Sequence, residues 1–292
     1  MAWSNCATCS EYLADAAVTA LVEEAELTPK PGLVDLQGSG AHTDLTIELM
    51  IRSAYSLRQT FAEIALAAFR LSPSQSLREE IARIGRQGEN AMYAATGGTN
   101  THKGAIWAIG LLVAGAAMRK REAAAEEIAA VAGELARFPD RFAPRQNTNG
   151  SRVRQRYGVA GARGEAQQGF PHVTTIALPA LRNARRDGLP ERLARIDALI
   201  ALIATLDDTC LLHRGGEDAL RVAKQKAGEI RAAGGVSTEA GWQGLGELDR
   251  ELLLRHASPG GSADLLAAAL FLDRLQADQP NITKGRELAW KR

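Results

Sequence analysis

Short glycine-bounded segments that carry a cation or a carboxylate recur along this sequence, and such segments could do phosphate chemistry. In Thr96–Gly104 a glycine pair leads into the predicted start of a helix, with Lys103 in its first turn. Free backbone N–H groups at a helix N-terminus favour an anion, and a lysine adds to that preference. We therefore interpret this segment as a phosphate-binding turn, in which Asn100, Thr101 and Lys103 contact a nucleotide, rather than as a simple cap. It is not a Walker A loop, because the spacing differs and no strand precedes it.

Three other cations occupy comparable turns. Prolines on both sides of Lys30 fix the backbone, so this residue either marks a helix stop or holds a charge towards a phosphate. Glycines surround Arg163 and Glu165, which read either as a surface ion pair or as a phosphate clamp beside a general base. Arg214 precedes two glycines and again indicates a phosphate contact.

Carboxylates in the same connectors predict a divalent cation. Asp207 and Asp208 are expected to close a helix, where carboxylates oppose the helix dipole unless a cation compensates. Hard oxygen ligands of this kind suit Mg²⁺, whose shell substrate phosphates can complete. Asp264 opens the last predicted helix, and His42 and Asp44 lie two residues apart in a turn. Helix capping is the alternative explanation for both aspartates.

The elements that must position these turns are predicted from helical periodicity, because apolar residues recur at three- and four-residue steps. We expect helices over Glu11–Leu27, Asp44–Leu71, Ser76–Ala95, Lys103–Lys120, Ala123–Phe138, Val173–Asp187, Arg192–Leu206, Glu217–Ala233, Thr238–His256 and Asp264–Leu275. No segment alternates as a strand would. The prediction is an all-α fold, a single multi-helix bundle domain over residues 1–292, with its site formed by glycine-rich interhelical loops.

Composition narrows the function classes. The net charge of +1 offers no overall field for nucleic acid or an anionic membrane. The longest apolar stretch, Gly104–Met118, is shorter than the roughly 18 residues that a membrane span needs. No secretory signal opens the chain, and three cysteines do not make a disulfide framework. We expect a cytoplasmic protein, and the sequence leaves its oligomeric state open.

At these motifs the chain resembles the triphosphoribosyl-dephospho-coenzyme A synthase family. The matching segments occur in order across nearly the whole chain: TPKPGLVD (28–35), GAHTD (40–44), GGTNTHKG (97–104), GARGEA (161–166), DDT with RGG (207–216) and SPGGSADLL (258–266). The resemblance implies an all-helical, cytoplasmic enzyme that uses ATP and Mg²⁺. Such an enzyme joins C1 of the ATP ribose to the 2′-hydroxyl of 3′-dephospho-coenzyme A and releases adenine.

The family has branches that serve malonate decarboxylase and citrate lyase. Asp207 before Asp208, and His213 before Arg214, look more like the malonate decarboxylase branch. The product would then pass to a transferase that loads the acyl carrier subunit. The same reaction serving citrate lyase remains the alternative.

The implied chemistry suggests roles for the conspicuous side chains. The acceptor hydroxyl needs a general base, for which Glu165 is the first choice and Glu89 the second. His102 or His42 would orient metal ligands or protonate adenine. The remaining assignments are phosphate binding for Lys30, Asn100, Thr101, Lys103, Arg163 and Arg214, and Mg²⁺ binding for Asp44, Asp208, Asp264 and His42.

Two rival functions belong to other classes. DDT turns in helical proteins also resemble ADP-ribosylglycohydrolases, which break a similar ribosyl bond with water, but the many lysines and arginines of the other turns exceed what such a hydrolase needs. A non-catalytic helical scaffold is the second rival, and it leaves the charged glycine turns unexplained.

Overall fold

The structure is a computed structural model that describes residues 3–144 and 148–277, and its regular elements there are helices. Its only β-type pairing in those ranges is an isolated bridge between Asp35 and Gly38. The predicted all-α fold is confirmed. The helices are α1 Cys6–Glu26, α2 Ile47–Ser56, α3 Arg58–Ala68, α4 Gln75–Thr96, α5 Lys103–Met118, α6 Ala125–Arg137, α7 Asn149–Tyr157, α8 Gly161–Gln167, the π-helix η1 His172–Ala177, α9 Leu178–Arg186, α10 Glu191–Thr205, α11 Thr209–Ala232, α12 Glu239–Leu254 and α13 Gly260–Ala277.

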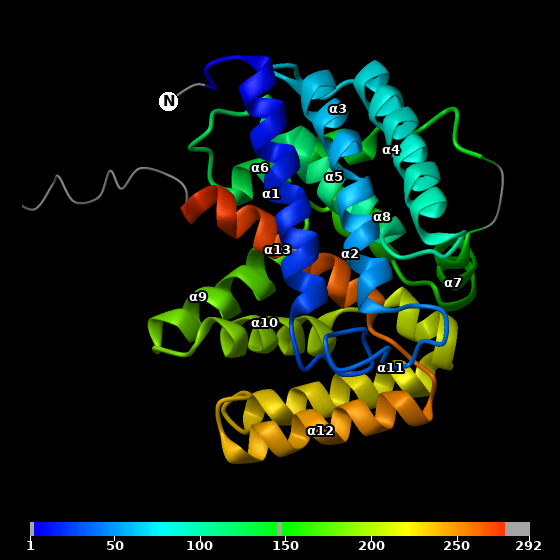
Figure 1. Cartoon of the computed structure of the whole chain (residues 1–292), viewed down its shortest axis with the longest axis vertical. Coiled ribbons are helices and arrows are strands. Elements are labelled where there is room, and N and C mark those ends of the chain that lie inside the picture. Colours follow the sequence, from blue (N-terminus) through cyan, green and yellow to red (C-terminus); the bar gives the residue numbers. More distant parts are fainter. Residues whose placement is uncertain (1–2, 145–147, 278–292) are drawn as a thin grey trace, which may run out of the picture.

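The centre of the molecule is built around two helices that are apolar on every side. Every residue from Ala108 to Met118 of α5 is buried, and so is every residue from Leu265 to Leu272 of α13. Burial of this kind supplies most of the stability of a helix in a protein. Helices α1 and α3 pack around this pair, while α11 and α12 lie side by side at one end of the molecule (Figure 1). Within the described ranges, no helix combines the length and the apolar character needed to cross a bilayer.

Several predicted boundaries were wrong, each for a local reason. The helix expected over Asp44–Leu71 is divided at Leu57, whose N–H bonds back to Ala54 and ends α2. The stretch between the helices expected over Ala123–Phe138 and Val173–Asp187 contains α7 and α8. Helix α7 is polar and basic, and α8 is short and rich in glycine and alanine, so neither has an apolar stripe that periodicity could reveal.

The turn expected before Glu217 is also helical. Helix α11 begins at Thr209 and continues through the arginine–glycine–glycine segment with an irregularity at Gly216, whose φ is 67° and ψ is −163°. Only glycine adopts this conformation readily. Arg214 therefore projects from a helix and not from a loop.

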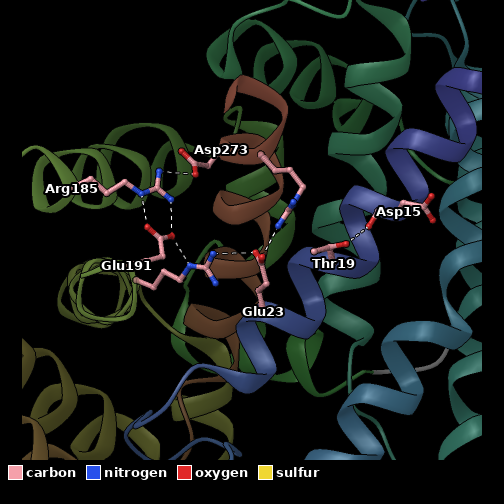
Figure 2. A network of polar contacts seen from close by, with 8 residues as sticks. Asp15, Thr19, Glu23, Arg185, Glu191 and Asp273 are labelled. Carbon is pink, nitrogen blue, oxygen red and sulfur yellow. Dashed lines mark hydrogen bonds and ion pairs between the residues drawn. The ribbon is translucent and has the colours of Figure 1, made fainter. Parts of the chain in front are cut away.

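An ion-pair network joins the outer helices to this centre (Figure 2). Arg185 of α9 binds Glu191 of α10 and Asp273 of α13 at 2.8 Å each. Glu23 of α1 binds Arg274 of α13 at 2.5 Å, and Arg195 of α10 at 3.3 Å. None of these residues belongs to the glycine-bounded motifs, so the network holds helices together and is separate from the candidate site.

Candidate active site

The N-termini of α11 and α13 meet at one buried carboxylate. Asp208 is the N-cap of α11 and accepts hydrogen bonds from the backbone N–H of Cys210 at 2.8 Å. It also accepts from the N–H of Gly261 at 3.2 Å, and from the N–H and hydroxyl of Ser262 at 2.7 and 2.9 Å. One side chain thus caps two helices whose motifs are some fifty residues apart, as the 54-residue separation from Ser262 shows.

This geometry corrects one sequence inference. Asp208 was expected to close a helix, but α10 ends at Thr205 and Asp208 begins α11. A carboxylate at a helix N-terminus is favoured by the dipole, so the argument that a cation must compensate it there does not hold. Burial raises the pKa of Asp208, and its hydrogen bonds to Ser262, Cys210 and Leu211 act in the opposite direction.

Asp264 reaches from α13 to the N-terminus of a third helix, α5. Its carboxylate accepts the backbone N–H of Ala105 and lies directly over Gly104. A Cβ at Gly104 would stand only 1.9 Å from Oδ2 of Asp264, so any other residue here would displace that carboxylate. Burial raises the pKa of Asp264 well above its usual range, and the charges of Glu24 and Asp208 raise it further. The carboxylates of Glu24, Asp208 and Asp264 are therefore neighbours.

Lys30 neutralises one of these acids from inside the protein. Its buried ammonium donates to Oε1 and to the backbone carbonyl oxygen of Glu24, both at 2.6 Å. The sequence predicted that Lys30 would face a phosphate, whereas the structure places it in a buried ion pair at the end of α1. The loop that carries it also borders a pocket of about 410 Å³, whose far wall includes Trp242 and Asp249 of α12.

His102 is buried between this ion pair and α2. Its Nδ1 lies 2.8 Å from the hydroxyl of Ser53, which is 2.5 Å from the hydroxyl of Thr101. Its Nε2 has no hydrogen-bond partner among the described residues. Burial, with a smaller contribution from the charge of Lys30, lowers the pKa of His102 to about 3. The imidazole is therefore neutral at working pH, and it can orient a ligand better than it can protonate one.

Glu24, Lys30, His102, Asp208 and Asp264 together form what we call the inner polar cluster. Lys30 pairs with Glu24, and Asp208 and Asp264 add two buried carboxyl groups that make no ion pair with any described cation. Within the described ranges, no three histidine, cysteine, aspartate or glutamate side chains could hold a metal ion among themselves. The cluster fits Mg²⁺ only as a shared site, because that ion is commonly bound by one or two carboxylates plus substrate phosphates.

The GAHTD turn lies against α11 and not in the inner polar cluster. Arg214 donates from Nη2 to Nδ1 of His42 at 3.0 Å, and that nitrogen is 3.8 Å from the carboxylate of Asp44. Burial and then the Arg214 charge lower the pKa of His42 to about 4, so its ring is neutral and accepts this bond. The Asp44 side chain is 60% exposed, which sets it apart from the buried acids.

The turn before α5 uses its polar side chains to hold itself together. Asn100 accepts the backbone N–H of Lys103 at 3.2 Å, and Thr101 contacts Ser53. The ammonium of Lys103 pairs with Glu89 of α4 at 2.7 Å, and both side chains are partly exposed. Lys103 is thus within reach of solvent and of a ligand, while Glu89 is occupied by a cation and is a weak candidate for a base.

Glu165 is one half of a pair that sequence reasoning did not identify. Its Oε1 accepts the backbone N–H of His172 at 2.8 Å, and its Oε2 accepts the Nδ1–H of the same residue at 2.7 Å. The hydrogen bond that His172 donates to Glu165, together with the charge of that carboxylate and the backbone of Thr205, raises the pKa of His172, while burial acts in the opposite direction. No role was predicted for His172, because a seven-residue separation across a turn is no recognisable motif.

Helix α8 brings this pair beside the other motifs. The indole N–H of Trp107 in α5 donates to the carbonyl oxygen of Ala162 at 3.0 Å. A Cβ at Gly161 would be 3.3 Å from Cγ2 of Thr209, the first residue of α11. The GARGEA segment therefore lies between the N-terminal parts of α5 and α11. Contacts in one region thus link this segment to the predicted turns at residues 40–44, 97–104, 207–216 and 258–266.

Comparisons with known proteins agree with this arrangement of motifs. A family model described as ATP:dephospho-CoA triphosphoribosyl transferase matches residues 10–283. A protein of Pseudomonas fluorescens named a probable 2-(5′′-triphosphoribosyl)-3′-dephosphocoenzyme-A synthase is 53% identical over 269 residues, 92% of each chain. The synthase of that name from Klebsiella pneumoniae is 51% identical over 264 residues, 90% of this chain and 94% of the relative. No solved structure matches the chain. The resemblance seen in the motifs is confirmed.

Proposed function

We propose, because the chain belongs to the ATP:dephospho-CoA triphosphoribosyl transferase family, that it transfers the 5-triphosphoribosyl group of ATP to the 2′-hydroxyl of 3′-dephospho-coenzyme A. Adenine is the leaving group. The observation that best supports this function is the meeting of the N-termini of α5, α11 and α13 at the buried carboxylates of Asp208 and Asp264. Helix N-termini bind phosphates, and buried acids beside them bind the accompanying cation.

The triphosphate would lie at the outer side of these helix ends. Lys103 and Arg214 supply cations there, and Lys103 can exchange its Glu89 partner for a phosphate because the pair is partly exposed. Mg²⁺ would be held by Asp264, with Asp208 behind it, and would neutralise phosphate charge when bound. Asp264 is the better ligand of the two, because five hydrogen bonds from α11 and α13 already use both oxygens of Asp208.

The reaction exchanges one bond at C1 of the ribose for another. The bond from C1 to N9 of adenine breaks, and its electron pair leaves with the base. The 2′-hydroxyl oxygen of the acceptor bonds to C1 and loses its proton, while adenine gains one, so that no other reactant is needed. Positive charge that develops on the ribose is stabilised by the carboxylates of the inner polar cluster.

We assign removal of the proton from the acceptor 2′-hydroxyl to the pair of Glu165 and His172. Glu165 accepts the Nδ1–H of His172, so Nε2 is the ring nitrogen that would take the proton, and the carboxylate would stabilise the imidazolium that results. This assignment refines the prediction that Glu165 is itself the base. In it Glu165 is a positioning residue, and His172 touches the substrate.

The experiment that tests the function is an adenine-release assay with the purified full chain, ATP, Mg²⁺ and 3′-dephospho-coenzyme A. We expect adenine and a triphosphoribosylated acceptor in equal amounts, measured by chromatography and mass spectrometry. Adenine formed equally well without the acceptor would identify a hydrolase instead. Absence of adenine from every mixture would favour a non-catalytic scaffold. Either outcome would refute the proposed transferase activity.

We further propose that the product serves malonate decarboxylase, which the order of Asp207–Asp208 and His213–Arg214 supports. It would pass to a transferase that loads the acyl carrier subunit, in the cytoplasm, where ATP is available. Because both branches make the same compound, the test is genetic. Deletion of the gene should abolish growth on malonate and spare citrate fermentation, and the reverse would assign the chain to citrate lyase.

A further inference from the structure

A buried arginine outside the inner polar cluster has no anion to bind. Arg78 of α4 is 6% exposed, and its Nε is buried without a hydrogen-bond partner among the described residues. The guanidinium lies 5.0 Å from the centre of the Trp107 ring in α5. It makes no ion pair with any carboxylate that the structure describes, although buried arginines are normally paired.

Two further arginines surround it. Arg163 of α8 follows Ala162, whose carbonyl oxygen accepts the indole N–H of the same Trp107 that Arg78 covers. Burial lowers the pKa of Arg78, the charges of Arg163 and Arg86 of α4 lower it further, and Asp140 opposes them. Asp140 is already engaged by Arg86 at 2.5 Å. Three guanidinium groups and one carboxylate leave two positive charges on a small surface. That excess equals the charge that a pyrophosphate diester would bring.

Stacking on Trp107 alone is not a sufficient reason for this arrangement. A cation over a ring gains modestly, whereas burying an unpaired guanidinium beside a second one is unfavourable. If Arg78 only packed against the indole, methionine or leucine would pack there without repelling Arg163. Arginine pairs are, however, suited to phosphates, because the planar guanidinium donates two parallel hydrogen bonds.

We propose that Arg78 and Arg163 form a subsite for a pyrophosphate group, in which Trp107 packs against Arg78 and Arg86 adds a further positive charge. It lies one helical turn along α5 from Lys103, since Trp107 is four residues further on. Arg163 of this subsite lies on the same short helix, α8, as Glu165, which is two residues further along the chain. A substrate held there by its pyrophosphate has its remaining parts close to the pair of Glu165 and His172.

The pyrophosphate group could belong to ATP or to 3′-dephospho-coenzyme A, and the proposed function indicates which of the two substrates binds in this subsite. The turns at Lys103 and Arg214 take the triphosphate of ATP, so the arginine subsite receives the pyrophosphate of 3′-dephospho-coenzyme A. This identification rests on the proposed function, whereas the existence of the subsite does not.

The first test measures binding without turnover. Inorganic pyrophosphate is titrated into the full chain by calorimetry, with Arg78→Met and, as a matched control on the same helix, Arg83→Met. Arg83 is half-exposed and pairs with Glu80, so its loss removes one charge from α4 outside the subsite. We expect Arg78→Met to weaken binding about ten-fold to a hundred-fold, and Arg83→Met to bind as the wild type does. No binding by the wild type, or equal loss in both variants, would overturn the subsite.

A melting curve separates a binding role from a structural one. Without ligand, Arg78→Met should melt at or above the wild-type temperature, because an unpaired buried charge has been removed. Pyrophosphate should raise the melting temperature of the wild type and leave that of Arg78→Met unchanged. A lower melting temperature for the unliganded variant, with its response to pyrophosphate retained, would make Arg78 a packing residue and overturn the proposal.

The second test identifies the source of the group. We expect Arg78→Met to raise KM for 3′-dephospho-coenzyme A about ten-fold or more and to leave KM for ATP unchanged. A rise in KM for ATP alone would place the ATP phosphates in the subsite, and a change in neither would overturn it. If the wild type binds pyrophosphate through Arg78 yet releases no adenine, the proposed function fails while the subsite stands.

Discussion

The buried imidazole of His102 should make the stability of the protein depend on pH in a way that one substitution removes. Its pKa in the folded protein is about 3, because burial and the Lys30 charge disfavour the imidazolium. In the unfolded chain the pKa returns to about 6.5. Between these values the unfolded state binds a proton that the folded state does not bind. Stability is therefore greatest above the unfolded value and falls as the pH falls below about 6.5.

The size of the effect follows from the two pKa values. Lowering the pH from 7 to 5 protonates His102 in the unfolded state only, which lowers the free energy of that state by roughly 2 kcal/mol. His42, with a pKa of about 4 in the folded protein, acts in the same direction, and it is present in the wild type and in a His102→Gln variant alike. The comparison of His102→Gln with the wild type cancels it, together with every carboxylate that titrates in that range.

The measurement is urea unfolding at pH 7 and pH 5, followed by circular dichroism, for the wild type and for His102→Gln. Glutamine keeps a polar group near Ser53 and does not titrate. We expect the wild type to lose about 2 kcal/mol more than the variant between the two pH values. A difference below roughly 0.5 kcal/mol would mean that His102 is protonated in the folded state, and the neutral orienting role would be wrong.

Three other substitutions test the site. Gly104→Ala forces the carboxylate of Asp264 away and should lower turnover about 100-fold. Its control is Gly85→Ala, whose Cβ would meet only Ile106 at 4.0 Å, and which should stabilise α4 by about 0.5–1 kcal/mol with activity unchanged. Equal activities of the two variants would show that Asp264 has no role in the site. Glu165→Gln should lower the pKa of His172, move the acid limb of the kcat profile to lower pH and reduce its plateau about 100-fold, and an unmoved limb would return the base role to Glu165. Asp208→Asn replaces one of the two acceptor oxygens by an amide NH2, which must then face donors of α11 or α13, and should lower the free energy of unfolding by roughly 1–3 kcal/mol; a stabilised variant would contradict the double cap.

The helices that the sequence predicted best are those whose stability comes from apolar burial. Helix α5 was placed at its first residue and within two residues of its last, because its continuous apolar side chains leave no alternative. Helices α7 and α8 escaped prediction because neither has a stripe of apolar residues: α7 is held by its Thr148 cap and by contacts with α11, and α8 by contacts with α5 and α6. Periodicity reports burial, and it says nothing of a helix that buries little of its own surface.

The candidate site was predictable as a set of segments and not as a set of contacts. The turns at Lys103, Asp208 and Asp264 meet in space, which their shared composition indicated. The partners could not be foreseen, because a charged side chain pairs with whichever opposite charge the fold brings near. Lys30 shows this most clearly: its rigid turn was recognised, but Glu24, which binds it, lies in the preceding helix without any motif.

The pair of Glu165 and His172 shows what residue type and spacing alone did not reveal about the predicted base. A carboxylate flanked by glycines looks free to approach a substrate, and for an isolated residue that inference is sound. In the fold, both oxygens of Glu165 are bound by one residue, through its backbone N–H and through its ring. A carboxylate so engaged is poorly placed to take a proton from elsewhere, yet it is well placed to fix a ring and to stabilise its charged form. In the proposed mechanism Nε2 of His172, whose side chain is only partly buried, therefore takes the proton, and Glu165 orients the ring.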